Sequence, residues 1–432
     1  MVLGAKSQSR QSRKTPALHF GPEPARVLLT SGESASLRDL VASRCTSLPS
    51  TYRPPWWLPK FTVYSVVGHF AKIDQVWYQR LADDGTLGLD FTPPDVSTVR
   101  DDAPIIVVQH GLTGGSHEPY VRAVLAPACA PVHQSGLGFR AVVVNFRGCV
   151  PLTSARFYTA AQTDDLRQAI IYITTLYPKA PLLGLGFSMG GNILVRYLAE
   201  EGANSRLSAA RVLAPGTCRP QTSTDSPAAC GTPRGAGRAT CAAWGATSRP
   251  SCAGTAHPAH PAAQFLRLRR PTRTAFDDRF TRARVWRAAP AVPLPVRARL
   301  LRLASSHEVA EDIRVPCLTI NARDDPVVQG VQRNGYVVAV LTARGGHLGW
   351  FERRWTTDPV LEWLALAGRE FVRPRGPRTR EGACPADLEE DGDGDGDGFL
   401  RDARWPQLGC KRVPGGGLVD GNRPTSELFQ GL

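Results

Sequence analysis

The sequence predicts an α/β protein with a mostly parallel central sheet and helices on both of its faces. Two observations carry this prediction: short apolar runs alternate with stretches of helical length, and Gly-rich turns follow several of the runs. Thr163 is a good N-cap for one helix, with Asp164 and Asp165 in its first turn. In chain order, the expected strands and helices cover residues 104–109, about 117–129, 139–146, about 164–177, 182–187 and 190–201.

Ser188 lies in the pentapeptide Gly186-Phe187-Ser188-Met189-Gly190. A buried-strand run precedes it and a helical stretch follows. A strand, a sharp turn with Gly on both sides of a Ser, and a helix form a nucleophile elbow. Ordinary Gly-rich turns can have the same Gly-x-Ser-x-Gly sequence, so the motif alone is not specific. The expected strand before it and helix after it are what support Ser188 as a nucleophile.

An upstream Gly-rich loop fits an oxyanion hole. The apolar run 104–109 ends in His110-Gly111-Leu112-Thr113-Gly114-Gly115. Such a loop lets backbone N–H groups face a ligand, and we assign the hole to the N–H groups of Leu112 and Met189. His110 precedes the nucleophile, and we expect it to belong to this loop rather than to act as the base.

The acid and the base are expected downstream of Ser188. An apolar strand over 315–321 runs into Asp324 and Asp325, and neighbours on an extended segment point in opposite directions, so only one carboxylate reaches the histidine. The Pro-Val-Val run that follows favours Asp325 as the acid, which leaves Asp324 as a turn cap or loop ligand. His347 follows two glycines and is the expected base.

These blocks, together with Asn145-Phe146-Arg147-Gly148-Cys149, resemble the YheT-like branch of the α/β-hydrolases. That branch includes the fungal medium-chain ethyl ester synthase/esterases and related acylglycerol lipases. The resemblance covers roughly residues 50–202 and 272–365. It implies an α/β-hydrolase fold in which Ser188, Asp325 and His347 match the charge-relay positions.

The resemblance further implies a serine esterase with some acyltransferase capacity. The expected substrates are medium-chain acyl esters, acylglycerols or acyl-CoA, with water or an alcohol as acceptor and with no cofactor or metal. A second hypothesis stays open: a non-catalytic relative that keeps the triad residues but lacks a complete lid and sheet, or a gene-prediction error within 203–270.

The amino-acid composition of the chain limits the classes of binding partner that we expect. The chain has 432 residues and a net charge of +14, nearly all of it from Arg, without a nucleic-acid-binding motif, so no nucleic acid is expected. Peripheral contact with a membrane or lipid droplet fits the charge better. Ten cysteines without metal-ligand spacing and no secretory signal predict an intracellular protein, cytoplasmic or peripheral on a lipid surface. The basic, Ser-rich residues 1–22 are expected to be a disordered tail, with mitochondrial targeting as the alternative.

Domain organisation follows from composition along the chain. We expect two halves of one hydrolase domain, with little order elsewhere and a poorly formed lid. The run Asp391–Gly398 superficially resembles a calcium loop, but flanking helices are absent, and a solvated linker is expected. The predicted segments are 1–50 (mostly disordered), 51–202 (first half), 203–270 (irregular and low in Ile, Val and Phe), 271–368 (second half) and 369–432 (disordered tail).

Overall fold

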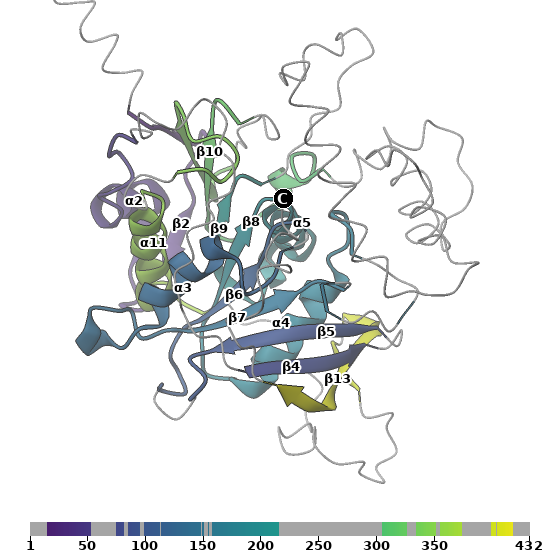
Figure 1. Cartoon of the computed structure of the whole chain (residues 1–432). Coiled ribbons are helices and arrows are strands. Elements are labelled where there is room, and N and C mark those ends of the chain that lie inside the picture. Colours follow the sequence, from purple (N-terminus) through teal and green to yellow (C-terminus); the bar gives the residue numbers. More distant parts are fainter. Residues whose placement is uncertain are drawn as a thin grey trace, which may run out of the picture.

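The computed structural model has one large sheet with helices packed on both sides (Figure 1). It describes residues 15–52, 75–81, 85–95, 99–112, 114–147, 149–150, 154, 158–215, 305–325, 334–350, 355–373, 399–402 and 404–417. Within them, the 11-stranded sheet has the order β1 (Ala17–Phe20), β11 (Val337–Thr342), β10 (Cys317–Ala322), β9 (Leu207–Leu213), β8 (Leu182–Phe187), β6 (Ile105–Gln109), β7 (Arg140–Asn145), β5 (Thr86–Thr92), β4 (Gln75–Leu81), β13 (Trp405–Gly417) and β12 (Leu400–Asp402).

The six central strands, from β11 to β7 in that order, are parallel, and the strands outside them pair antiparallel. Every residue of β6, β7 and β8 is buried. Continuous apolar runs of this kind are typical of parallel strands covered on both faces. The predicted fold class is therefore confirmed, and the predicted strands over 104–109, 139–146 and 182–187 match these three within a residue.

Helices cover the two faces of the sheet, and each face has its own apolar core. One core contains the helices α2 (Leu37–Arg44), α3 (Pro119–Cys129) and α11 (Thr357–Glu370), and the other contains α4 (Asp164–Leu176) and α5 (Met189–Glu201). Three short 3-10 turns and a two-stranded ribbon complete the described elements: η2 (Val132–Gln134), η3 (Gly202–Asn204), η5 (Ala310–Asp312), β2 (Arg26–Leu28) and β3 (Ser34–Ser36). No helix among the described residues is long and apolar enough to span a bilayer.

The prediction of a mostly disordered segment over 1–50 is wrong for residues 15–50. Strand β1 pairs antiparallel with β11, and α2 buries Leu37, Leu40 and Val41 against the sheet. Elements this short have little stability on their own, since most helical stability in proteins comes from tertiary packing. Composition alone therefore did not indicate them.

The prediction for 203–270 is wrong at its start. Strand β9 occupies Leu207–Leu213, is buried along its whole length, and lies between β8 and β10. Leu207–Leu213 is the one stretch of 203–270 whose sequence is similar to a strand of the resembled family, and the low apolar content of the segment as a whole obscured it. The rest of that segment, 216–270, and with it the predicted lid, lies outside the described residues.

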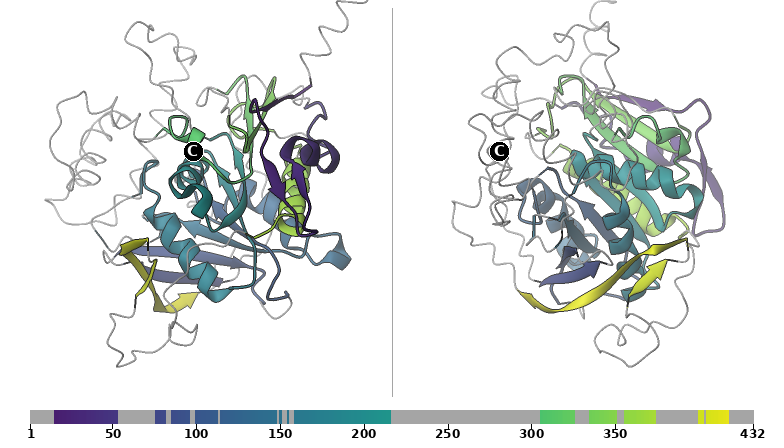
Figure 2. Two further views of the ribbon diagram at one scale, coloured as in Figure 1. Left: turned by 180° about the vertical axis from the view of Figure 1, so that it is seen from behind. Right: turned by 90° about the vertical axis from the view of Figure 1, so that its right-hand side faces the viewer.

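The prediction of a disordered tail over 369–432 is also wrong in part. Strand β13 pairs with β4 and β12 pairs with β13, which places these strands at the sheet edge opposite β1, as Figure 2 shows. Ion pairs fix the hairpin: Arg206 contacts Asp402 at 2.9 Å and Arg404 contacts Glu201 at 2.5 Å. These partners come from distant parts of the chain, so no local pattern reveals them. The run Asp391–Gly398 lies outside the described residues.

Two arginines in the core have opposite surroundings. Arg147 is 1% exposed and donates from Nε and Nη2 to the Asp165 carboxylate at 2.8 and 2.6 Å. Arg211, in the middle of β9, is 0% exposed, and no residue within the described ranges accepts a hydrogen bond from its guanidinium. Burial lowers the pKa of Arg211 to about 9. Its charge therefore costs free energy at neutral pH.

We expect Arg211→Met to raise the free energy of unfolding by about 2 kcal/mol, because a buried charge with no acceptor in the described part of the chain is replaced by an apolar side chain of similar length. The matched control, Arg147→Met, should lower it by about 3–5 kcal/mol, since the buried Asp165 carboxylate loses its guanidinium partner. Denaturant unfolding followed by tryptophan fluorescence measures both. A lower unfolding midpoint for Arg211→Met than for the unchanged chain would contradict the prediction.

Candidate active site

Ser188 occupies the sharp turn between β8 and α5. Its backbone has φ 50° and ψ −116°, a conformation that non-glycine residues rarely adopt. The turn is tight because its glycines allow close backbone approach: a Cβ on Gly186 would lie 2.7 Å from Gly191 Cα, and one on Gly190 would collide with the carbonyl oxygens of Gln109 and His110. The Ser188 N–H donates to the Leu213 carbonyl of β9 at 2.9 Å, which ties the turn to the sheet.

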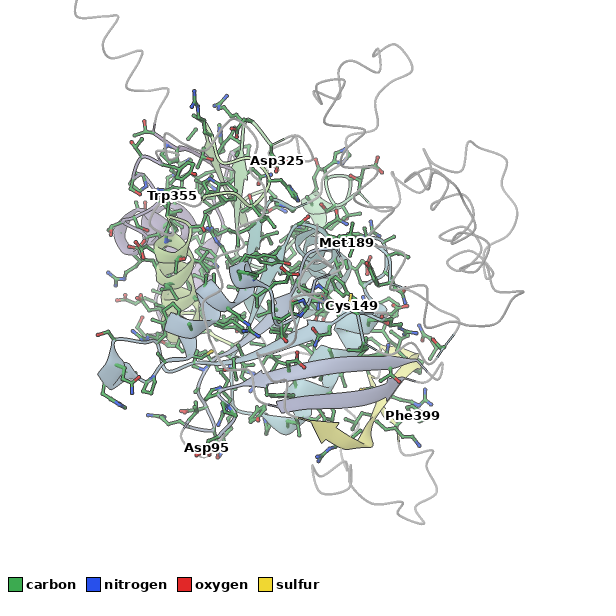
Figure 3. All side chains as sticks on the ribbon, in the orientation of Figure 1. Asp95, Cys149, Met189, Asp325, Trp355 and Phe399 are labelled. Atoms are coloured by element: carbon green, nitrogen blue, oxygen red, sulfur yellow. The ribbon has the colours of Figure 1, made fainter. Side chains whose placement is uncertain are left out.

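Ser188, His347 and Asp325 form a continuous hydrogen-bonded chain. His347 Nε2 lies 2.7 Å from Ser188 Oγ, and His347 Nδ1 lies 3.0 Å from Asp325 Oδ2. The Asp325 side chain is fully buried and that of His347 is 11% exposed. The three residues follow β8, β10 and β11, whose carboxyl ends meet at one edge because the strands are parallel. Figure 3 labels Asp325 and, at the start of α5, Met189.

The two adjacent aspartates contact different groups. Asp325 reaches the His347 ring, whereas Asp324 Oδ1 accepts a hydrogen bond from the Gly346 N–H at 2.9 Å. Only one carboxylate faces the imidazole, as the alternating directions of neighbouring side chains predict. The structure thus brings together Ser188, Asp325 and His347. Asp324 instead accepts a hydrogen bond from the loop that carries His347.

The Gly-rich loop after β6 lies directly beside the nucleophile. A Cβ built on Gly111 would be 3.8 Å from Ser188 Cβ. The Gly111 N–H donates to the Tyr120 hydroxyl at 2.9 Å, and the Tyr120 ring packs on Phe187 at 4.9 Å. This tyrosine, which sequence analysis missed, therefore contacts both the loop and the strand that precedes Ser188.

Both expected oxyanion donors belong to segments next to Ser188. Leu112 directly follows Gly111, and Met189 is the first residue of α5, where helix N–H groups have no intrahelical acceptor. The positive end of the helix dipole lies at the same place. Thr113 of the loop motif lies outside the described residues.

His110 has a structural position. Its Nε2 accepts from the Phe146 N–H at 3.3 Å, and its Nδ1 lies 2.7 Å from the Gly111 carbonyl oxygen. Burial lowers the pKa of His110 to about 3, so the ring stays neutral. One ring nitrogen of His110 is thus engaged by Phe146, just after β7, and the other by Gly111 of the loop, so neither serves Ser188 as a base.

A network of buried polar side chains holds the segment that follows the Gly-rich loop after β6. The Asn145 side chain donates to Asp90 Oδ2 at 2.8 Å and accepts from the Ser116 N–H at 3.2 Å. Burial raises the pKa of Glu118 at the N-terminus of α3 to about 7, and the nearby Arg122 opposes that rise. Asn145 was noted in the sequence only as part of a motif, and its pairing with Asp90 was not predicted because the two residues are 55 positions apart. Among the described residues, no group of His, Cys, Asp and Glu is arranged to hold a metal ion.

The fold and this site define a class: an α/β protein with a hydrogen-bonded Ser–His–Asp set on a nucleophile elbow. Comparison with known families agrees, because the family described as "alpha/beta hydrolase fold" matches residues 104–334, more than half of the chain. The chain belongs to the α/β-hydrolase family, and the resemblance found in the sequence is confirmed at this level.

The individual relatives have low sequence identity to this chain, and each match covers only part of both proteins. The chain is 27% identical over 312 residues to a monoacylglycerol lipase of Saccharomyces cerevisiae, covering 65% of this chain and 64% of that protein. It is 30% identical over 289 residues to medium-chain fatty acid ethyl ester synthase/esterase 2 of the same yeast, covering 61% and 62%. It is 35% identical over 200 residues to human phospholipase ABHD3, covering 44% and 47%. The matches therefore span less than two thirds of each relative's length.

We expect Asp325→Asn to lower kcat for an ester substrate by about 10⁴-fold, since the imidazole loses its anionic partner and its tautomer preference. Asp324→Asn keeps an acceptor oxygen for the Gly346 N–H and should cost less than about tenfold. Steady-state kinetics of the two variants at equal folded concentration measures the difference. If Asp324→Asn were the more damaging change, the two roles would have to be exchanged.

Proposed function

We propose that the protein is a serine carboxylic-ester hydrolase. The observation that carries this proposal is the chain from Ser188 Oγ through the His347 ring to Asp325, with distances of 2.7 and 3.0 Å. Hydrogen bonds in this order activate a serine hydroxyl, since a base within reach removes its proton as it attacks.

The proposed reaction begins when His347 Nε2 takes the Ser188 proton and Oγ attacks the acyl carbonyl. Asp325 accepts the Nδ1–H, which keeps the imidazole in the tautomer that leaves Nε2 free to accept, and it stabilises the imidazolium that forms. His347 then protonates the leaving alcohol, and an acyl-enzyme remains on Ser188. Water or another alcohol, deprotonated by His347, attacks this ester. The acyl–Oγ bond then breaks, the acid or a new ester leaves, and His347 returns the proton to Ser188 Oγ.

The negative charge on the oxygen of each tetrahedral intermediate must be stabilised by hydrogen-bond donors. We assign them to the backbone N–H groups of Leu112 and Met189, which flank Ser188 from the loop and from α5. The hydroxyl of Tyr120 accepts the Gly111 N–H, so the Gly111 amide is engaged within the site and is not one of the assigned donors.

The substrate class that we propose for this protein rests on the names of its relatives. Their names describe a monoacylglycerol lipase, a medium-chain fatty acid ethyl ester synthase/esterase and a phospholipase. We therefore propose medium-chain acyl esters or acylglycerols as substrates and, as finer hypotheses, acyl-CoA donors and transient contact with a lipid surface. Alcohol acyltransfer is proposed as a secondary activity, since the Ser–His pair does not select its acceptor.

We expect Ser188→Ala to lower turnover of a p-nitrophenyl ester by at least about 10⁴-fold without changing the unfolding midpoint, because the nucleophile is lost and no packing is disturbed. A fluorophosphonate probe should label the unchanged chain at Ser188 and leave the variant unlabelled. A folded chain whose Ser188 resists the probe would support the alternative of a non-catalytic relative.

We expect hydrolysis to exceed ester synthesis except at high alcohol concentration. The protein groups that surround the acyl-enzyme select the acceptor, and the lid that would supply them is expected to be poorly formed because Ile, Val and Phe are scarce within 203–270. Product partitioning from a medium-chain acyl donor, measured as ethanol is raised, tests this. Efficient ester formation at low ethanol with little free acid would contradict it.

A further inference from the structure

The turn that carries His347 has an unfavourable backbone. Gly345 and Gly346 have φ values of 148° and 55°, and Leu348, which has a side chain, has φ 62°. One internal hydrogen bond closes the turn, from the Gly349 N–H to the Gly345 carbonyl at 2.9 Å. Conformations of this kind persist only where the surroundings hold them, so the contacts around the turn decide where the imidazole lies.

The first half of the turn is fixed by the hydrolase sheet. Asp324, at the end of β10, accepts the Gly346 N–H at 2.9 Å. Thr342, the last residue of β11, donates from its hydroxyl to the Arg344 carbonyl at 2.7 Å and accepts from Trp350 Nε1 at 3.0 Å. The backbone before His347 is thereby attached to two strand ends.

The second half of the turn is held by the Trp350 bond to Thr342 and, in addition, by the N-terminal segment. The hydroxyl of Tyr52 donates to the Gly349 carbonyl at 3.1 Å, across 297 residues of chain, and Tyr52 is 7% exposed. The Tyr52 ring lies 6.1 Å from the ring of Trp355, whose Nε1 donates to the Ser50 carbonyl and hydroxyl at 3.0 and 2.8 Å. Trp355 also packs on Trp350 at 6.5 Å, so an aromatic cluster anchors Tyr52 beside the turn (Trp355 is labelled in Figure 3).

We infer that Tyr52 is a positioning residue for His347, and that the N-terminal segment is part of the catalytic apparatus. The inference rests on the proposed function, since it concerns the same base. Tyr52 contacts neither Ser188 nor the imidazole among the contacts described. It holds the Gly349 carbonyl, two residues after His347, and so limits the swing of the ring toward or away from Ser188 Oγ. Proton transfer in such sites is sensitive to displacements near 1 Å.

The test is Tyr52→Phe, which keeps the ring in the aromatic cluster and removes only the hydroxyl. We expect kcat to fall about tenfold with KM within about twofold, because a misplaced base slows chemistry more than binding. Rates are expressed per active site, titrated with the fluorophosphonate probe. The control is Tyr177→Phe, a half-buried tyrosine that packs against Arg140 away from the site and should leave kcat unchanged.

A second measurement does not depend on turnover. The Nδ1 proton of His347, shared with Asp325, is expected as a downfield NMR resonance that Tyr52→Phe shifts or broadens and Tyr177→Phe leaves in place. An unchanged resonance, or a rate per titrated site equal to that of the unchanged chain, would overturn the inference and leave the proposed function standing. A chain that hydrolyses no ester and resists the probe would instead remove the proposed function, while the resonance would still report whether Tyr52 positions the ring.

Discussion

The strained turn at Ser188 is the constraint on which the rest of the site depends. A serine at φ 50° costs on the order of 1–3 kcal/mol, and it persists because β8 and α5 are both packed into the core and hold the turn between them. The close approach of β6 to the first turn of α5 excludes any side chain at position 190. The same approach brings the Gly-rich loop beside Ser188, so the geometry that strains the nucleophile also delivers the oxyanion loop.

The parallel strand order explains how distant residues meet. Ser188 and His347 are 159 residues apart in sequence, yet their side chains share a hydrogen bond because β8, β10 and β11 end at one edge of the sheet. Strand β9 is the link between them, since it pairs with both β8 and β10 and accepts the Ser188 N–H. Arg211, whose guanidinium has no hydrogen-bond acceptor among the residues that the structure describes, thus lies in the strand that joins the nucleophile to the acid and base.

Sequence patterns predicted the parts of the molecule whose signal is local. The buried runs of β6, β7 and β8 are strongly apolar, and the elbow pairs a motif with its own flanking elements, so each could be inferred from a short window. The preference for Asp325 over Asp324 matches the contacts in the structure, and so does the assignment of His110 to the loop. Tyr52 and the pairing of β13 with β4 were missed because the partners are remote in sequence, and Tyr120 was missed although Gly111 is only nine residues away. An isolated tyrosine or a three-residue strand carries no pattern until its partner is known.

The two ends of the described chain lie at opposite edges of the sheet, and this has a consequence for how the protein tolerates shortening. The outermost strands, β1 and β12, have 4 and 3 residues, and they cover the longer strands β11 and β13. Long exposed edges recruit strands from other chains, whereas very short ones offer few backbone groups for such pairing. Removing β1 would uncover the six residues of β11, and removing the C-terminal hairpin would uncover the seven residues of β4. Either edge would be a site for intermolecular strand addition, so insolubility would appear before any loss of the residues that perform the chemistry.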